Sequence, residues 1–413
     1  MTKKSNSTHV LVVLENNLFP IDTRVKPHVD CLRENGYAVT VISPAAKGFA
    51  WHETIDGVRV FRFPSLMAKK SAIGYLIEFA IATFFLTALI LWVLIRHGVD
   101  ILLFYNPPDI LFILGIIPKL LGKTIVFDVR DISPELFKSK FDTPNPLLVR
   151  LLLSMEFLSC QVADHVITVN ESYRRILQER NRLSKDKFTI VRQGPDLKIV
   201  KLSQPVSELR NRAKTIFAYL GNMSRQDGVE HLLYALSELN GHQDWLCVLI
   251  GGVDEPEVLN KLADELGIAD KLWFTGFLPF EEWVPLVSTA DICVEPAPAN
   301  PLNSISTMNK IMDYMALGKP SVVYDLPEHR VTAAESALYA KPNDPSDLAR
   351  QIIYLMDHPD ERERIGAIGR ARVEKELALA HQREHLLKLF SKLSEQCDND
   401  TKSGIFRETS RDH

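Results

Sequence analysis

The segment Glu295–Pro320 carries the side chains that are best placed in this chain to bind an anion. Its apolar residues recur at helical spacing, which predicts a helix from Ser306 to Gly318. The first turn of a helix has unpaired backbone N–H groups, and the hydroxyls of Ser306 and Thr307 would stand beside them. Lys310, one turn further in, would add a full positive charge. The segment therefore predicts a site for a phosphate group.

Two carboxylates accompany this predicted phosphate site. Asp313 lies three residues after Lys310 and could accept hydrogen bonds from sugar hydroxyls. Glu295 ends the strand-like run before the loop and is a weaker candidate for the same role. Phosphate at the helix start and hydroxyls deeper in are what a nucleotide-sugar needs, although an ordinary capped helix of an α/β domain would show the same local features.

Two further turns in the second half follow strand-like runs. Gly221 and Asn222 form the first turn, where glycine lets the backbone approach a ligand closely. Arg225 projects from this turn at the start of a helix, where a diphosphate would sit. Gly276 and Phe277 form the second turn, against which a flat base could lie. Tight turns with core aromatics and an exposed arginine are the structural alternatives.

The first half offers polar residues in two loops after strand-like runs. Asn17, Asp22 and Arg24 follow the first run and are candidates for substrate contacts. Asp131 follows a later run and could bind a substrate hydroxyl, since loops at strand ends line the ligand site of such sheets. An internal Asp–Arg pair that fixes the loop is the alternative interpretation.

Strand-like and helix-like runs alternate throughout the chain. This alternation predicts right-handed crossovers and parallel sheets. The expected strands are residues 10–14, 38–43, 58–63, 101–105, 124–129, 165–169, 189–192, 216–220, 245–250, 272–275, 292–295 and 321–324.

The weakest pattern lies at 194–212, which we take as a linker between two doubly wound domains. The first domain is expected to span 1–198 and the second 199–375. A helix at 376–395 would pack across the domain join, and the polar tail 396–413 is expected to be disordered. Two facing domains of this kind bind ligand in the cleft, at the carboxyl ends of their strands.

Composition excludes several classes of protein. The net charge of −4 excludes a globally basic nucleic-acid binder. The five cysteines are scattered without a C-x-x-C pair, which indicates free thiols in a reducing compartment. The apolar run at 10–14 is too short for a signal-peptide core. The glycines at 251–252 do not form a G-x-G-x-x-G fingerprint, which disfavours an NAD-dependent dehydrogenase.

Residues 79–95 form an apolar run without a charged side chain. Its length is at the low edge for a membrane-spanning helix. The run could be a buried helix, a spanning helix, or a helix that rests its apolar face in a membrane interface. Spanning is the least favoured, because strands expected in one sheet lie on both sides of the run. Basic residues nearby, such as Arg96, could meet anionic lipid headgroups.

The strand-end loops of the second half resemble the C-terminal domain of glycosyltransferase family 4, whose members are retaining enzymes of the GT-B fold. The resemblance extends over most of the chain. It rests on the sequences YLGNMSRQDG, FTGFLP, ADICVEPAP and STMNKIMDYMALGKP, of which the last is the most specific. It implies an α/β protein with two facing Rossmann-like domains and a cleft between them.

The resemblance also implies roles for individual residues. Arg225 and Lys310, with Ser306 and Thr307, would hold the donor diphosphate. Asp313 stands where such enzymes usually carry a glutamate that bonds the ribose. Asn17, Asp22 and Arg24, with Gly221 and Asn222, would belong to the loops around the donor, and Gly276 with Phe277 would hold its base. Asp131 would serve on the acceptor side. We expect neither a metal nor a cofactor, since none of these loops carries a D-x-D motif.

Two departures from the family pattern are evident. Asp227 precedes Gly228 where relatives often carry lysine, so one diphosphate charge is missing and Lys310 would compensate for it. Ile305 stands where the family's E-x7-E motif has its first glutamate, which leaves the sugar contact unassigned apart from Glu295. A branch of the family carries this S-T-M-x-K pattern, which favours subfamily character over loss of function.

The expected activity is transfer of a sugar from a nucleotide-sugar to a lipid-linked or oligosaccharide acceptor, in the assembly of surface polysaccharide. Membrane contact is expected through residues 72–96, and the protein would lie in the cytoplasm on the inner face of the plasma membrane. Nucleic acid is not an expected partner. A nucleotide-sugar 2-epimerase of the same fold and a non-catalytic scaffold remain alternatives.

Overall fold

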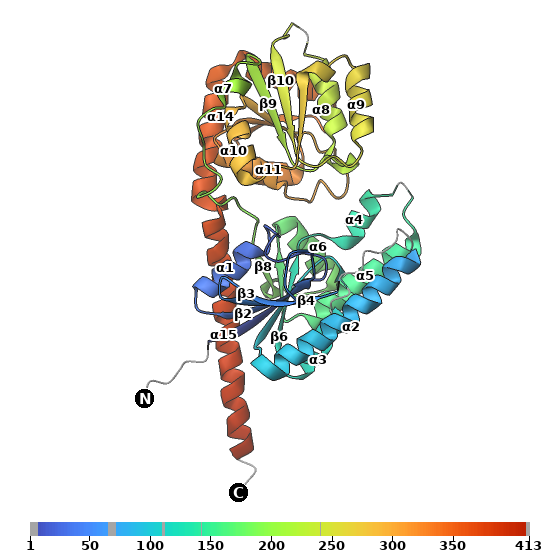
Figure 1. Cartoon of the computed structure of the whole chain (residues 1–413), viewed down its shortest axis with the longest axis vertical. Helices are drawn as coiled ribbons and strands as arrows, with labels where there is room; N and C mark the ends of the chain where they lie inside the picture. The colour runs from blue at the N-terminus through green and yellow to red at the C-terminus, as the bar shows by residue number, and fades with distance from the viewer. Residues whose placement is uncertain (1–6, 65–71, 110–111, 142, 240, 410–413) are drawn as a thin grey trace. The chain divides into compact units, whose positions relative to one another are not determined.

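The computed structural model describes residues 7–64, 72–109, 112–141, 143–239 and 241–409. It divides the chain into two compact units, shown in Figure 1. Unit 1 comprises residues 1–191 and 383–413, and unit 2 comprises residues 192–382. The division falls a few residues before the domain boundary expected at 198, and the C-terminal segment belongs to unit 1.

Unit 1 is built on an eight-stranded sheet with the order β3-β4-β2-β1-β5-β6-β7-β8. All neighbouring strands are parallel except β3, which runs antiparallel to β4 at the edge. The strands are β1 His9–Val13, β2 Ala38–Pro44, β3 His52–Ile55, β4 Val58–Phe63, β5 Ile101–Tyr105, β6 Thr124–Val129, β7 His165–Thr168 and β8 Phe188–Ile190. The helices are α1 Lys26–Glu34, α2 Ala72–His97, α3 Phe112–Leu120, α4 Ser133–Ser139, α5 Pro146–Val162, α6 Glu171–Asn181 and the short 3-10 turn η2 Lys185–Lys187.

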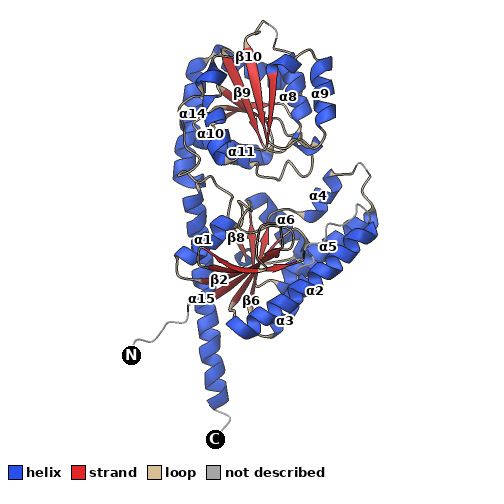
Figure 2. Ribbon diagram, in the orientation of Figure 1, coloured by secondary structure: helices blue, strands red, loops and turns tan. Residues whose placement is uncertain are grey.

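Helices cover both faces of this sheet, as Figure 2 shows. On one face, α1 and the part of α15 (Leu379–Thr409) that follows Gln382 bury Leu32, Leu386 and Phe390 against the strands. On the other face, α2, α3, α5 and α6 supply buried residues that include Leu86 and Cys160. Central strands such as β5 are buried along their whole length, because a parallel sheet covered on both faces has no solvated side.

Unit 2 is built on a six-stranded parallel sheet with the order β11-β10-β9-β12-β13-β14. The strands are β9 Thr215–Leu220, β10 Trp245–Ile250, β11 Leu272–Gly276, β12 Ile292–Glu295, β13 Ser321–Tyr324 and β14 Ala337–Ala340. The helices are α7 Ser207–Arg210, α8 Val229–Ser237, α9 Pro256–Glu265, α10 Phe280–Thr289, α11 Asn309–Ala316, α12 Pro327–Ala333, α13 Pro345–Asp357 and α14 Pro359–Arg372, with 3-10 turns η3 Arg225–Asp227 and η4 Ala269–Lys271 and a π-helical turn η5 Val373–Leu377. Two core clusters, one on each face of the sheet, complete a second doubly wound layer structure.

Two strands, the linker and the C-terminal tail differ from what the sequence predicted. Strand β3 was not expected because it is a polar edge strand, and β14, at the edge of the other sheet, was not expected either. The expected linker at 194–212 packs on unit 2, where Val200 and Leu209 join its core. The tail expected to be disordered from Gln396 instead continues α15 as far as Thr409.

Helix α2 is neither wholly buried nor wholly exposed. Ala82, Leu86 and Ile90 face the core of unit 1, whereas Phe84 and Ile95 point outward. By length and composition, residues 80–97 are the one stretch of the described chain that could cross a membrane, and 28% of that stretch is buried in the protein. The exposure of Phe84 and Ile95 on the other face excludes the buried helix that the sequence had left open.

Candidate donor site in unit 2

The loops that follow β9, β10 and β11 are joined by backbone contacts at the carboxyl edge of the sheet. The amide of Gly221 donates to the carbonyl of Ile250 at 2.8 Å, and the amide of Gly251 donates to the carbonyl of Gly276 at 3.0 Å. Gly251 has a φ of +138°, and a Cβ there would lie 1.9 Å from the carbonyl oxygen of Gly221. Only glycine fits at this junction, which fixes three loop ends relative to one another.

Lys310 occupies the centre of this edge. Its ammonium lies 2.9 Å from Glu295 Oε2 and 3.7 Å from Asp227 Oδ1, and it donates a hydrogen bond of 2.8 Å to the hydroxyl of Tyr219. A Cβ on Gly221 would lie 2.9 Å from Lys310 Cε, so the glycine makes room for the lysine. Burial by itself would lower the pKa of Lys310, but Glu295, Tyr219 and Asp227 together outweigh it and raise the pKa above its ordinary value.

Asp227 has a structural task in addition to its charge. Its Oδ2 accepts hydrogen bonds from the amide of Ser224 at 3.1 Å and from the hydroxyl of Ser224 at 2.5 Å. Together these residues form a capping box at the start of η3. The ammonium of Lys310, 3.7 Å away, places a positive charge beside the carboxylate that replaces the usual lysine. The expected compensation by Lys310 at the donor diphosphate stays a prediction.

The helix that carries Lys310 begins later than expected. Helix α11 starts at Asn309 and not at Ser306, so Lys310 lies in its first turn. Ser306 and Thr307 precede the helix, where the Ser306 hydroxyl donates to the carbonyl of Leu302 at 2.8 Å. The helix start predicted at Ser306 is therefore too early, and Met308 holds the N-cap position without a side-chain hydrogen bond.

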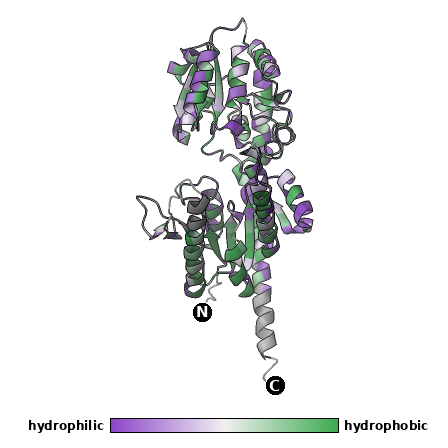
Figure 3. Ribbon diagram, turned by 90° about the vertical axis from the view of Figure 1, so that its right-hand side faces the viewer, coloured by the Kyte–Doolittle hydropathy of each residue, from purple (hydrophilic) through white to green (hydrophobic). Residues whose placement is uncertain are grey.

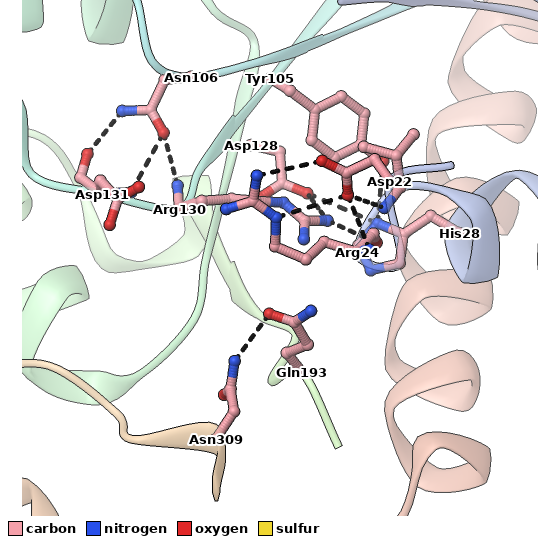
Figure 4. Close-up of polar contacts among 11 residues, drawn as sticks. Asp22, Arg24, His28, Tyr105, Asn106, Asp128, Arg130, Asp131, Gln193 and Asn309 are labelled. Carbon is pink, nitrogen blue, oxygen red and sulfur yellow. Dashed lines mark hydrogen bonds and ion pairs between the residues drawn. The ribbon is translucent and has the colours of Figure 1, made fainter. Parts of the chain in front are cut away.

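Figure 4 shows that the side chain of Asn309, the first residue of α11, bonds to Gln193. The Asn309 amide donates to Gln193 Oε1 at 2.9 Å, which ties the helix start to the segment just after Arg192.

Asp313 lies on the second turn of α11 and is partly exposed. Within the described chain its carboxylate makes no hydrogen bond or ion pair, and loss of solvation raises its pKa to about 7. Such a group is ready to accept hydrogen bonds from a ligand. The structure leaves the Asp313 carboxylate available for a ligand, and its contact with the ribose stays a prediction.

The remaining predicted donor residues lie in the loops at the same sheet edge. Arg225 and Asn222 are exposed in the loop after β9. Phe277 directly follows β11, and its side chain is 84% exposed, so it is not one of the core aromatics of the alternative interpretation. Gly276 has a φ of +71°, a backbone conformation that turns the chain sharply at this point.

Unit 1 has its own polar cluster at the carboxyl ends of its strands, drawn in Figure 4. Arg24 donates to Asp22 at 3.1 Å and to Asn17 at 3.5 Å. Asp22 also accepts from the backbone amides of Arg24 and Val25, so it shapes the loop that leads into α1. Burial alone would raise the pKa of Asp22, but the hydrogen bond and charge of the Arg24 side chain and the two backbone hydrogen bonds together outweigh that effect and lower the pKa. Asp22 is therefore ionised and committed to this loop.

The Asp–Arg pair that had been considered for the loop after β6 is present, but it involves Asp128. Arg130 donates to Asp128 Oδ2 at 3.4 Å and to the carbonyl of Arg24 at 3.0 Å. Asp131 is outside this pair, and among the described residues its carboxylate has no hydrogen-bond or ion-pair partner. Burial raises the pKa of Asp131, which is the carboxylate of this cluster that remains available.

His28 is a buried member of this cluster that sequence reasoning missed. Its Nδ1 lies 3.0 Å from the hydroxyl of Tyr105 and 3.5 Å from Asp128 Oδ2. Burial holds the pKa of His28 well below its ordinary value, so the imidazole is neutral. A histidine on the buried face of an expected helix was the available signal, but one sequence could not show which strand it would meet.

Both halves of the chain match models of known protein families. Residues 21–194 match the model of the glycosyl transferase 4-like domain, and residues 201–372 match that of glycosyl transferases group 1. The alpha-maltose-1-phosphate synthase of Mycolicibacterium smegmatis is 25% identical over 261 residues, which cover 58% of this chain and 66% of that protein. A lipopolysaccharide core biosynthesis glycosyltransferase of Rhizobium meliloti is 27% identical over 184 residues, 44% of this chain and 49% of that protein.

A solved structure shares the fold over nearly the whole chain. Anabaena HepE in complex with UDP-glucose superposes with a TM-score of 0.70 at 15% identity and covers 93% of this chain and 99% of that one. The chain spans between 37% and 66% of the length of these curated relatives.

Proposed function

We propose that this protein transfers a sugar from a nucleotide-sugar donor to a lipid-linked saccharide acceptor. The chain belongs to the group 1 glycosyltransferases, and its N-terminal half matches the glycosyl transferase 4-like domain. The observation that supports this proposal most directly is the buried lysine at the edge of the unit 2 sheet. Lys310 is held at 2.9 Å from Glu295 at the first turn of α11, where a diphosphate would find a fixed positive charge.

The donor would bind through three kinds of contact. Lys310 and the exposed Arg225 supply the positive charge for the diphosphate. Asp313 supplies an acceptor for the ribose hydroxyls. Phe277 and Gly276 offer an exposed ring and an open backbone turn to the base. The complex of Anabaena HepE with UDP-glucose makes a uridine donor the first to test.

The reaction would retain the anomeric configuration of the sugar. The bond between the anomeric carbon and the leaving phosphate oxygen breaks, and a bond from the same face of that carbon to the acceptor oxygen forms. The acceptor proton passes to the leaving diphosphate, so the reaction needs no basic side chain of the enzyme. The chain's contribution is to position the two substrates and to stabilise the negative charge that develops on the diphosphate. We expect this to proceed without a metal or another cofactor.

The acceptor assignment rests on unit 1. Asp131 is the carboxylate there without a described partner, and we propose that it orients the acceptor hydroxyl. The exposed apolar side of α2 favours an acceptor that is presented at a membrane. Similarity to the lipopolysaccharide core glycosyltransferase of Rhizobium meliloti supports a role in surface polysaccharide assembly, on the cytoplasmic face of the plasma membrane.

Transfer is tested by incubating the protein with UDP-sugars and a membrane extract of polyprenyl-linked saccharides. We expect a glycosylated lipid, and NMR of the new linkage should show the configuration of the donor. Conversion of the donor to its 2-epimer without any acceptor would favour the epimerase alternative. Failure to bind any nucleoside diphosphate in calorimetry would favour the non-catalytic scaffold.

Donor affinity is expected to increase as the pH rises from 6 to 8. Because the pKa of Asp313 is about 7, its carboxyl is mainly protonated at the lower pH and mainly ionised at the higher. The ionised form accepts stronger hydrogen bonds, so the gain in affinity is at most about tenfold over this range. Calorimetry with an intact UDP-sugar measures it. Asp313→Asn should bind more weakly and lose this pH dependence, and an unchanged slope in the variant would refute the role of Asp313.

A further inference from the structure

The outward side of α2 is apolar from Ala80 to Ile95. Ala80, Phe84, Ala88 and Trp92 follow one another at four-residue spacing and are all exposed, and Ile95 continues the same side with 87% of its surface exposed. A surface helix of a soluble protein normally carries polar residues on this side. The inward side is also apolar, so α2 meets the sheet with one face and presents a second apolar face outward.

Two neighbouring helices extend this apolar surface. Helix α3 contacts α2, and α5 contacts α3. Figure 1 shows the three helices side by side, and Figure 3 shows hydrophobic colouring on the same side of unit 1. The large apolar side chains that α3 exposes are Ile113, Ile116, Ile117 and Leu120, and those that α5 exposes are Leu147, Leu148, Leu151, Phe157 and Leu158. We call α2, α3 and α5 with these exposed residues the three-helix face.

This much exposed apolar surface is unusual for a monomer. Soluble monomers rarely expose contiguous apolar patches larger than a few hundred square ångström, and larger ones mark contact with a protein or a membrane. Leu120 is 81% exposed and Leu147 is 71% exposed, although both could have been polar at no cost to the core. The three-helix face is therefore expected to be covered when the protein works.

The charges on these helices identify what covers it. Residues 80–97, 112–120 and 146–162 contain three basic residues, Arg96, Lys119 and Arg150. Their one acidic residue, Glu156, is 2% exposed and is paired with Arg180 inside the unit at 3.0 Å. Lys119 is paired with Asp164 at 3.0 Å, which leaves Arg96 and Arg150 as the exposed basic residues outside an ion pair among the described residues. Apolar side chains accompanied by such basic residues match the surface of an anionic bilayer.

We infer that the three-helix face lies flat in the interfacial layer of an anionic membrane. This inference rests on the proposed function, which assigned membrane contact to α2 alone, and it extends that contact to α3 and α5. A spanning α2 would have to withdraw Leu86, Ile90 and Val93 from the core that they share with the sheet. A symmetric contact with a second copy would bring the same basic side chains into one interface, which like charges disfavour.

Vesicle flotation tests the inference, with the full chain and vesicles of phosphatidylcholine with or without phosphatidylglycerol. The α3 variant Ile116→Ser/Leu120→Ser and the α5 variant Leu147→Ser/Leu151→Ser are each expected to weaken binding about tenfold or more, because each removes two apolar anchors. Phe84→Ser/Ile95→Ser in α2 should do the same. The control Val258→Ser/Val331→Ser removes exposed valines of unit 2 and should bind normally.

A charge variant tests whether anionic lipid attracts this face. Arg96→Gln/Arg150→Gln should reduce the preference for anionic vesicles and its sensitivity to salt. Normal binding by both the α3 and the α5 variants would overturn the three-helix face, and so would resistance of the bound protein to alkaline carbonate extraction. Loss of dimerisation in these variants, without vesicle binding by the parent, would assign the face to a second copy. Calorimetric donor binding, which depends on unit 2, shows separately whether the transferase proposal fails.

Discussion

Replacing Lys310 with alanine is expected to lower the rate of sugar transfer about 100- to 1,000-fold, the usual effect of removing one group that stabilises developing negative charge. Lys310 is the one cation in direct contact with both Glu295 and Asp227 among the described residues. The same change leaves Glu295 buried without its counter-ion, which costs about 3–5 kcal/mol of stability. Steady-state kinetics with saturating acceptor, together with urea unfolding, measures both effects.

A second variant separates catalysis from stability. In Lys310→Ala/Glu295→Gln the neutral amide can keep the hydrogen bond that Glu295 Oε1 accepts from Ala297, so stability should largely return while transfer stays low. Lys214→Ala removes an exposed lysine at the opposite end of β9 and should transfer normally. If Lys310→Ala and Arg225→Ala both transferred sugar at the parent rate, the diphosphate assignment would be wrong.

Changing Gly251 to alanine is expected to lower the stability of the folded chain by roughly 2–5 kcal/mol, the sum of left-handed backbone strain and overpacking. The new Cβ would lie 1.9 Å from the Gly221 carbonyl oxygen, and the backbone there is held by its hydrogen bond to Ile250. Relief of the clash must move the loop after β9, so donor affinity should fall as well. The shift of the urea midpoint and calorimetry with a UDP-sugar give the two measurements.

Gly267 provides the matched control for this substitution. It also has a positive φ, of +67°, but a Cβ there would meet no atom within 4 Å. Gly267→Ala should therefore cost only about 1 kcal/mol and leave donor affinity unchanged. Equal losses in the two variants would show that backbone conformation, and not the closeness of the loops, makes glycine necessary at 251.

The alternation of strands and helices was readable from the sequence because buried parallel strands are continuous apolar runs. Runs such as 101–105 and 245–250 match β5 and β10 residue for residue. The edge strand β3 has the sequence HETI and buries little, so hydrophobic periodicity carried no signal for it. The family resemblance, which the comparisons confirm, rested on the loops at strand ends.

The details of the site were harder to predict, because they depend on contacts between distant residues. The start of α11 was misplaced since Ser306 and Thr307 are residue types that often cap helices, whereas here Ser306 bonds to Leu302 in the loop before the helix. The partners of Lys310 lie 15 and 83 positions earlier, on β12 and in η3, and only the sheet order brings them together. His28 was missed for the same reason.

The contribution of α15 to unit 1 has a consequence for how the protein is made. The buried face of this helix, with Leu386 and Phe390, completes the core beneath β1 and β5. The last strand of that sheet ends at Ile190, about 200 residues earlier in the chain. At a synthesis rate of 5–20 residues per second, roughly 10–40 s pass before the missing layer is made. Through that interval one side of the nascent sheet has no helix from α15 over it, so unit 1 is the first domain to be translated and the last to be finished.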